Sequence, residues 1–85
     1  MKNLYHFEVS DTFGGEMNGT WIRRYKVHAK SLRGALIKVN REEGFSGRTK
    51  KVMESGELTR WDVSGACICI FGQEWDEYCA EGKEL

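Results

Sequence analysis

The chain has 85 residues, with 13 basic and 13 acidic side chains and a formal net charge of zero at neutral pH. An apolar content of 40% and a charged content of 31% exclude a disordered chain, and 85 residues leave room for only one domain, 1–85. No apolar run approaches the roughly 18 residues that a membrane helix needs, so we expect no membrane partner.

The N-terminal third predicts a β-hairpin. Residues 4–9 and 21–29 both alternate between apolar and polar side chains, as half-buried strands do. The intervening residues 10–20 are polar and rich in glycine, so we expect a long hairpin loop there. Arg23 falls on the apolar side, and we expect it near a sheet end or with its charged head reaching solvent.

A helix is predicted between Ser31 and Gly44. Ser31 is a favourable N-cap, and Gly44 suits the left-handed turn that ends many helices. Core-facing side chains recur at the i, i+3, i+4, i+7 spacing from Leu32 onward. Gly34 interrupts the helix at a cost of roughly 1 kcal/mol relative to alanine, which we explain by close packing on the sheet.

The C-terminal half predicts three more strands. Residues 48–54 and 58–63 flank a short turn and read as a second hairpin, after a turn at 45–47. Residues 66–71 are apolar throughout, which is typical of a central strand buried on both faces. For 73–80 we expect a short acidic helix, and for 81–85 a frayed tail.

These elements predict an α+β fold. It has an antiparallel sheet of four or five strands and one main helix on one face, in the order strand, strand, helix, then three strands. A short C-terminal helix is the optional addition. The expected core is Tyr5, Phe7, Val9, Trp21, Tyr25, Val27, Leu32, Ala35, Leu36, Val39, Trp61, Val63, Ile68 and Ile70.

The neutral total hides an uneven charge distribution. Residues 21–60 carry eleven basic and four acidic side chains, whereas residues 61–85 carry one basic and six acidic ones. Such segregation favours recognition of a charged partner, and clustered cations neutralise phosphates. The alternative is a solvated face that only keeps the chain soluble. We name eight candidate binding residues the basic block: Arg24, Lys26, Lys30, Arg33, Arg41, Arg48, Lys50 and Lys51.

The acidic C-terminal segment is the alternative interface. Its carboxylates could imitate phosphates or dock on a basic surface, whereas a solvated helix face or internal pairing with the basic block would need no partner. The candidate residues are Glu74, Asp76, Glu77 and Glu81.

The sequence does not predict a catalytic or metal site. Cys67 and Cys69 are too close along a strand to pair easily, and the odd count of three cysteines favours reduced thiols in the cytoplasm. The one-residue spacing of this pair does not match zinc motifs. His6 and His28 alternate outward, away from any cysteine nucleophile, and the glycines match no phosphate-binding loop. We therefore expect no enzyme activity, no metal and no cofactor.

Four motifs resemble small uncharacterised proteins of tailed phages: Trp-Ile-Arg-Arg-Tyr-Lys-Val at 21–27, Ser-Leu-Arg-Gly-Ala-Leu at 31–36, Glu-Gly-Phe-Ser-Gly at 43–47 and Arg-Trp-Asp-Val-Ser-Gly-Ala at 60–66. The resemblance covers about residues 4–72. The order of strands and helix also resembles, weakly, some small anti-CRISPR proteins, which bind the CRISPR surveillance complex. No functional residue of those inhibitors can be placed on this sequence.

From the charge pattern and the resemblance together, we expect a non-catalytic phage accessory protein. It would bind and modulate or inhibit a machine in the host cytoplasm, with a CRISPR effector as one such machine. Its partner would be a host protein or a protein–nucleic-acid complex. The alternatives are direct nucleic-acid binding through the basic block, and a structural or assembly role in the virion.

Overall fold

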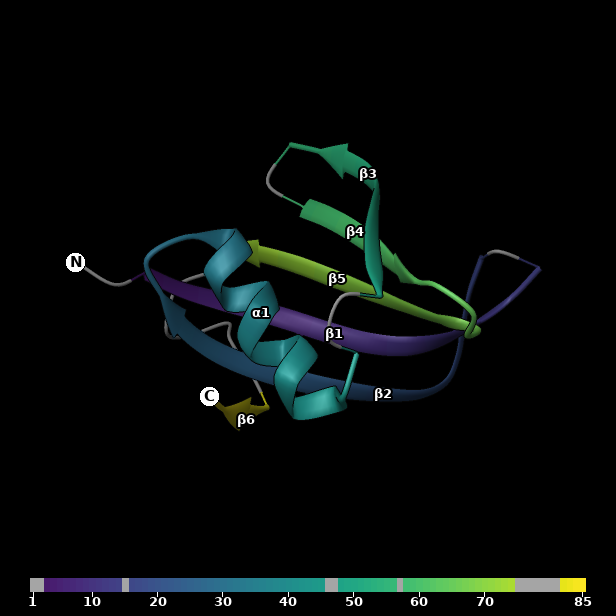
Figure 1. Cartoon of the computed structure of the whole chain (residues 1–85), viewed down its shortest axis with the longest axis horizontal. Helices are drawn as coiled ribbons and strands as arrows, with labels where there is room; N and C mark the ends of the chain where they lie inside the picture. The colour runs from purple at the N-terminus through teal and green to yellow at the C-terminus, as the bar shows by residue number, and fades with distance from the viewer. Residues whose placement is uncertain (1–2, 15, 46–47, 57, 75–81) are drawn as a thin grey trace.

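The computed structural model describes residues 3–14, 16–45, 48–56, 58–74 and 82–85. In these residues one helix lies on one face of a six-stranded sheet (Figure 1). The elements are β1 (Asn3–Phe13), β2 (Glu16–Ala29), α1 (Leu32–Glu43), β3 (Thr49–Ser55), β4 (Leu58–Val63), β5 (Ile68–Glu74) and β6 (Lys83–Glu84).

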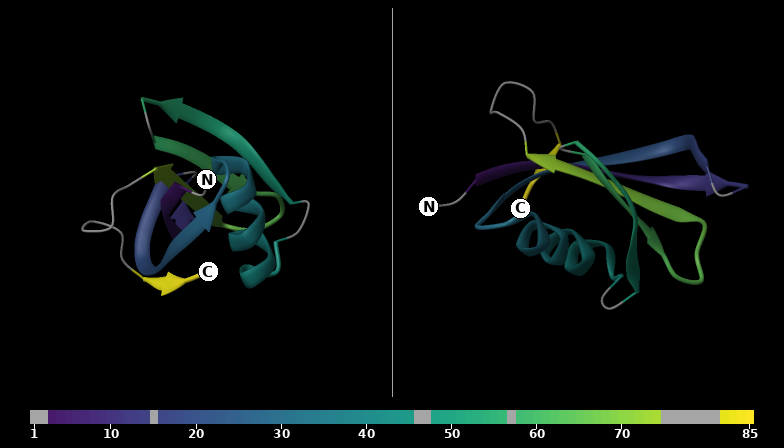
Figure 2. Two further views of the ribbon diagram at one scale, coloured as in Figure 1. Left: turned by 90° about the vertical axis from the view of Figure 1, so that its left-hand side faces the viewer. Right: turned by 90° about the horizontal axis from the view of Figure 1, so that it is seen from above.

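The sheet has the strand order β3-β4-β5-β1-β2-β6. Every neighbouring pair is antiparallel except β2 and β6, which are parallel. The α+β class is confirmed, and the sheet has one strand more than the four or five expected. Turned views show α1 on one face of the sheet and β6 at its edge (Figure 2).

The first hairpin is longer than predicted, and the loop expected over 10–20 is wrong. Strand pairing continues to Phe13 opposite Glu16, with an irregularity between Ser10 and Thr12. Gly14 has a φ of 64°, as a tight turn requires. The end of this hairpin is exposed and has no apolar face that must be buried. Its polar, glycine-rich composition is therefore compatible with strands and is not evidence for a loop.

The helix begins and ends where its capping residues predict. The Oγ atom of Ser31 accepts a hydrogen bond of 3.1 Å from the backbone N–H of Gly34, and Gly44 is left-handed with a φ of 79°. Ala35, Leu36 and Val39 are buried against the sheet. No helix within the described ranges is long and apolar enough to cross a membrane.

The expected core is largely confirmed. Eleven of the fourteen predicted residues are buried, while Trp21, Leu32 and Ile68 are half-buried and pack against that core. Among the residues that the structure describes, three apolar ones outside the predicted set are also buried: Ala29, Phe45 and Cys69. Phe45 is held directly after the helix, where its N–H donates to the carbonyl of Asn40 at 2.8 Å.

The packing role assigned to Gly34 belongs instead to Gly72. A Cβ added at Gly34 would lie in ordinary contact, 3.4 Å from the Ser31 hydroxyl. A Cβ at Gly72 would lie 2.5 Å from the Phe7 ring and 2.9 Å from the Trp61 ring. These two rings stack with their centroids 5.7 Å apart, and the bare backbone of β5 leaves room for them.

The predicted second hairpin is present as β3 and β4, and β5 is central, between β4 and β1. Cys67 is exposed before β5 begins, so the apolar run is not buried throughout. The helix expected over 73–80 is wrong at Gln73 and Glu74, which belong to β5, and 75–80 lie outside the described residues. The frayed end is wrong for 83–85: Leu85 donates to the Lys26 carbonyl at 2.8 Å.

Leu36→Ala should destabilise the protein by about 2–4 kcal/mol, because it removes a large side chain that is only 8% exposed. Arg41→Ala, on the exposed side of the same helix, should change the free energy of unfolding by less than about 0.5 kcal/mol. Urea unfolding measures both, and equal effects would contradict the observed orientation of α1.

The two glycines should respond oppositely to alanine. Gly34→Ala should stabilise the protein by roughly 0.5–1 kcal/mol, because the helix has space for the methyl group and loses less backbone entropy. Gly72→Ala should destabilise it by about 1–3 kcal/mol through overpacking against the two rings. Thermal and urea unfolding of both variants provide the comparison. An unchanged free energy of unfolding in Gly72→Ala would show that the Phe7 and Trp61 rings can move apart at no cost.

Candidate functional site

A cleft opens beside α1 because the sheet is wider than the helix. The helix contacts β2, β5 and β1, while β3 and β4 continue the same sheet past it. The space between α1 and the β3–β4 hairpin has a volume of about 530 Å³. That volume lies within the range of small-ligand sites, roughly 300–1,000 Å³.

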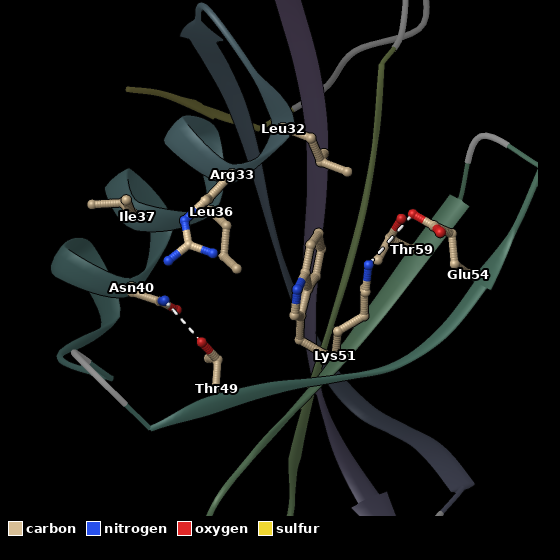
Figure 3. Close-up of a pocket in the computed structure, with 10 residues that line it drawn as sticks. Leu32, Arg33, Leu36, Ile37, Asn40, Thr49, Lys51, Glu54 and Thr59 are labelled. Carbon is tan, nitrogen blue, oxygen red and sulfur yellow. Dashed lines mark hydrogen bonds and ion pairs between the residues drawn. The ribbon is translucent and has the colours of Figure 1, made fainter.

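The cleft combines an apolar lining with polar side chains at its margins (Figure 3). Its apolar side chains are Leu32, Leu36 and Ile37 from α1 and Trp61 from β4. Its polar side chains are Arg33 and Asn40 from α1, Thr49, Lys51 and Glu54 from β3, and Thr59 from β4. Among the described residues that line it there is no histidine or cysteine.

Asn40 has a buried acceptor that the described residues leave unpaired. Its side chain is brought to the cleft by the last turn of α1, and the whole residue is 8% exposed. The Nδ2 atom donates to Thr49 Oγ1 at 3.1 Å, across the end of the cleft, but Oδ1 has no hydrogen-bond partner (Figure 3). A buried polar atom without a partner typically costs about 1–3 kcal/mol, so a ligand that donates a hydrogen bond here would remove a penalty.

Positive charge prevails at the cleft. Arg33 is exposed and forms no ion pair with any residue in the described part of the chain. Lys51 Nζ lies 3.7 Å from Glu54 Oε2, but both side chains are more than half exposed, and such pairs are weak in water. The two cations stand on opposite walls, Arg33 on the helix and Lys51 on β3 (Figure 3).

The structure does not bring the basic block together on one surface. Alternation along the strands directs Arg24, Lys26 and Lys50 away from the helix-bearing face. Arg24 Nε also lies 3.0 Å from Glu8 Oε2. Of the other members, Lys30, Arg33 and Arg41 lie on the helix side, Arg48 lies in the loop before β3, and Lys51 lines the cleft, as Arg33 also does. The eight residues therefore do not share one surface.

The cations on the helix side remain a coherent group. Lys30, Arg33 and Arg41 are exposed, and none of them has an ion pair with a described residue. Ile37 lies between the two arginines along the helix and is 44% exposed. This arrangement places an apolar side chain within a cationic surface, beside the cleft.

The acidic alternative is only partly described. Glu74 is exposed at the end of β5, whereas Asp76, Glu77 and Glu81 lie outside the described residues. Two other charged side chains of the C-terminal segment have partners within the chain. Lys83 Nζ lies 2.7 Å from Glu42 Oε2, and Glu84 Oε1 lies 3.1 Å from His28 Nε2.

The cysteines and histidines form no candidate centre in the described ranges. Cys67 is exposed and Cys69 is buried, both are free thiols, and burial raises the pKa of Cys69. Both histidines are on the sheet face away from α1, but His6 is buried rather than exposed. No group of three potential metal ligands occurs among the described side chains. Cys79 lies outside them.

Sequence reasoning missed a polar cluster that fixes the end of α1. Arg23 Nε donates to Glu43 Oε2 at 2.8 Å, the Tyr25 hydroxyl donates to the same carboxylate, and the Arg23 guanidinium lies 4.2 Å from the centre of the Trp21 ring. Arg23 is the residue from which this cluster could have been predicted, because a cation on the buried side of a strand requires a partner. Burial and then the bond to Glu43 raise the pKa of Tyr25 to about 12.

Comparison of the chain with protein-family models, with characterised proteins and with solved structures finds no match.

Glu43 should make the protein sensitive to acid. Burial alone would raise the pKa of its carboxyl, but hydrogen bonds from Arg23 and Tyr25 and the charge of Arg23 outweigh burial, so the pKa lies below its ordinary 4.5. A folded-state pKa below the unfolded one stabilises the protein above about pH 4.5, and that stabilisation is lost as the pH falls. Glu43→Gln should cost about 1–3 kcal/mol at pH 7 and much less in acid.

Urea unfolding of the wild type and of Glu43→Gln between pH 7 and pH 3 measures this effect. Glu54→Gln is the matched control, because the Glu54 carboxylate is 60% exposed and should contribute little at either pH. Parallel pH dependences for the wild type and Glu43→Gln would contradict the prediction.

Proposed function

We propose that the protein is a non-catalytic accessory protein of a phage that binds and modulates a host machine by holding part of a protein partner in the cleft beside α1. The observation that carries this proposal is the cleft itself, which joins an apolar lining, two cations and the unpaired Asn40 acceptor. The resemblance of the sequence to small tailed-phage proteins supplies the setting. A CRISPR effector is one host machine to test.

The composition of the cleft favours a protein partner over nucleic acid. Four large apolar side chains line it, and apolar contact is the main source of affinity in protein interfaces. Nucleic-acid surfaces are instead matched by continuous cationic tracks or by exposed aromatic platforms. The basic block is divided between two faces of the sheet, so it does not form such a track.

Direct nucleic-acid binding is the second candidate, and one observation favours it. Lys30, Arg33 and Arg41 are exposed on the helix side without an ion pair to any described residue, so their charge is available to phosphates. Binding of this kind would weaken steeply with salt, with a log–log slope of roughly −0.9 for each phosphate contact on duplex DNA.

Affinity capture from a lysate of the bacterial host, with and without nuclease, tests the two candidates. A partner protein should be recovered in both conditions, and Arg33→Glu with Arg41→Glu should reduce its recovery at least about tenfold, because the reversal makes the surface repel an acidic partner. Circular dichroism should stay unchanged, since both positions are exposed. Loss of the partner after nuclease treatment would overturn the proposal in favour of nucleic-acid binding.

Two controls make this experiment specific. Lys26→Glu with Lys50→Glu makes the same change of charge on the opposite face and should leave capture intact. Neutralising Asp76, Glu77 and Glu81 tests the acidic interface. Truncation after Gln73 is not a suitable test of the acidic interface, because it also removes β6. Loss of capture only in the neutralised variant would contradict a role for the cleft.

A further inference from the structure

We infer that the cleft binds an extended, acidic peptide segment of the partner, in which apolar side chains alternate with carboxylates. This inference rests on the function proposed above and specifies the chemistry of its ligand. It is carried by three features that meet in the cleft: the unpaired Asn40 acceptor, the cations on facing walls and the apolar lining between them.

The Asn40 acceptor selects for a ligand with a free hydrogen-bond donor. Its Oδ1 atom is buried and unpaired among the described residues, while Nδ2 is already engaged with Thr49. A peptide in extended conformation carries free backbone N–H groups, whereas those in the interior of a helix are bonded internally. Phosphodiester groups carry no donor at all. The acceptor therefore favours an extended peptide over a helix or a nucleic-acid backbone.

The charges select for carboxylates. Arg33 is free of ion pairs with described residues, and Lys51 is held only by a weak, exposed contact of 3.7 Å to Glu54. A carboxylate that approached Arg33 could form a bidentate pair, which is stronger than a neutral hydrogen bond. Because the two cations stand on opposite walls, a segment between them can meet both (Figure 3).

The apolar lining explains why apolar and acidic side chains should alternate along the peptide segment. Successive side chains of an extended peptide point to opposite sides. Leucine-sized side chains can then enter the cleft against Leu32, Leu36 and Trp61 while the intervening carboxylates stay at the charged margins. A cleft of about 530 Å³ lies within the usual size range of ligand sites, so side chains of this size can enter it.

Titration of the ¹⁵N-labelled protein with the capped hexapeptide Leu-Asp-Leu-Asp-Leu-Asp tests the inference. We expect shifts of the Asn40 side-chain amide and of neighbouring amides in α1 and β3, and no such shifts with Leu-Lys-Leu-Lys-Leu-Lys. Arg33→Glu should weaken binding at least about tenfold. Lys26→Glu, a charge reversal on the sheet face away from α1, should weaken it less than about threefold. Equal losses in the two variants, or shifts confined to other elements, would overturn the inference.

Methylation of each peptide N–H in turn tests the role of Asn40. At one position it should weaken binding to the wild type roughly three- to tenfold, and the same methylation should have little effect on Asn40→Ala. An equal loss in both proteins would show that Asn40 accepts no peptide N–H.

The two proposals fail in different ways. If a host protein is captured but the acidic hexapeptide neither binds the cleft nor competes, only the inference about the ligand is wrong. If the hexapeptide binds the cleft but no host protein is captured in either nuclease condition, the proposed function is wrong.

Discussion

The cleft depends on one contact, the stacking of Phe7 from β1 with Trp61 from β4 over the backbone of Gly72. Because β5 carries no side chain at that point, two rings from strands on either side of it can meet. The stack therefore joins the β3–β4 hairpin to the centre of the sheet. Trp61 belongs both to this stack and to the lining of the cleft, so core packing sets the position of a binding surface.

The opposite wall of the cleft is fixed by separate interactions. The Lys38 ammonium donates to the His28 carbonyl of β2 at 2.6 Å, and near the end of α1 Glu43 is bound by Arg23 and Tyr25 from β2. Since β2 is buried in the sheet through Val27 and Ala29, the helix cannot slide without breaking these polar contacts. Two walls that have their own anchoring contacts and are joined by the Asn40–Thr49 hydrogen bond give a cleft of defined width, and preorganisation of this kind reduces the entropic cost of binding.

Local patterns predicted the helix, its caps and most of the core, because those features depend on residues close together in the sequence. The division of the basic block could not be seen in this way: strand alternation sends Lys50 and Lys51 to opposite faces, and only the tertiary structure shows which of the two lies on the helix side. Lys51 is opposite Trp61, and both line the cleft beside α1. The same holds for the Phe7–Trp61 stack, which is set by register between distant strands that composition does not specify. The Asn40–Thr49 hydrogen bond depends instead on how the end of α1 lies against the start of β3.

The strand order also determines when the core can close as the chain is made. The β1–β2 hairpin and α1 are formed from the first 43 residues, yet the other side of β1 pairs with β5, where Phe7 meets Gly72 and Val9 meets Ile70. During synthesis one long edge of β1 therefore stays unpaired until residues some sixty positions later have been made. Joining the two halves closes a long loop, and we expect that step to limit the folding rate.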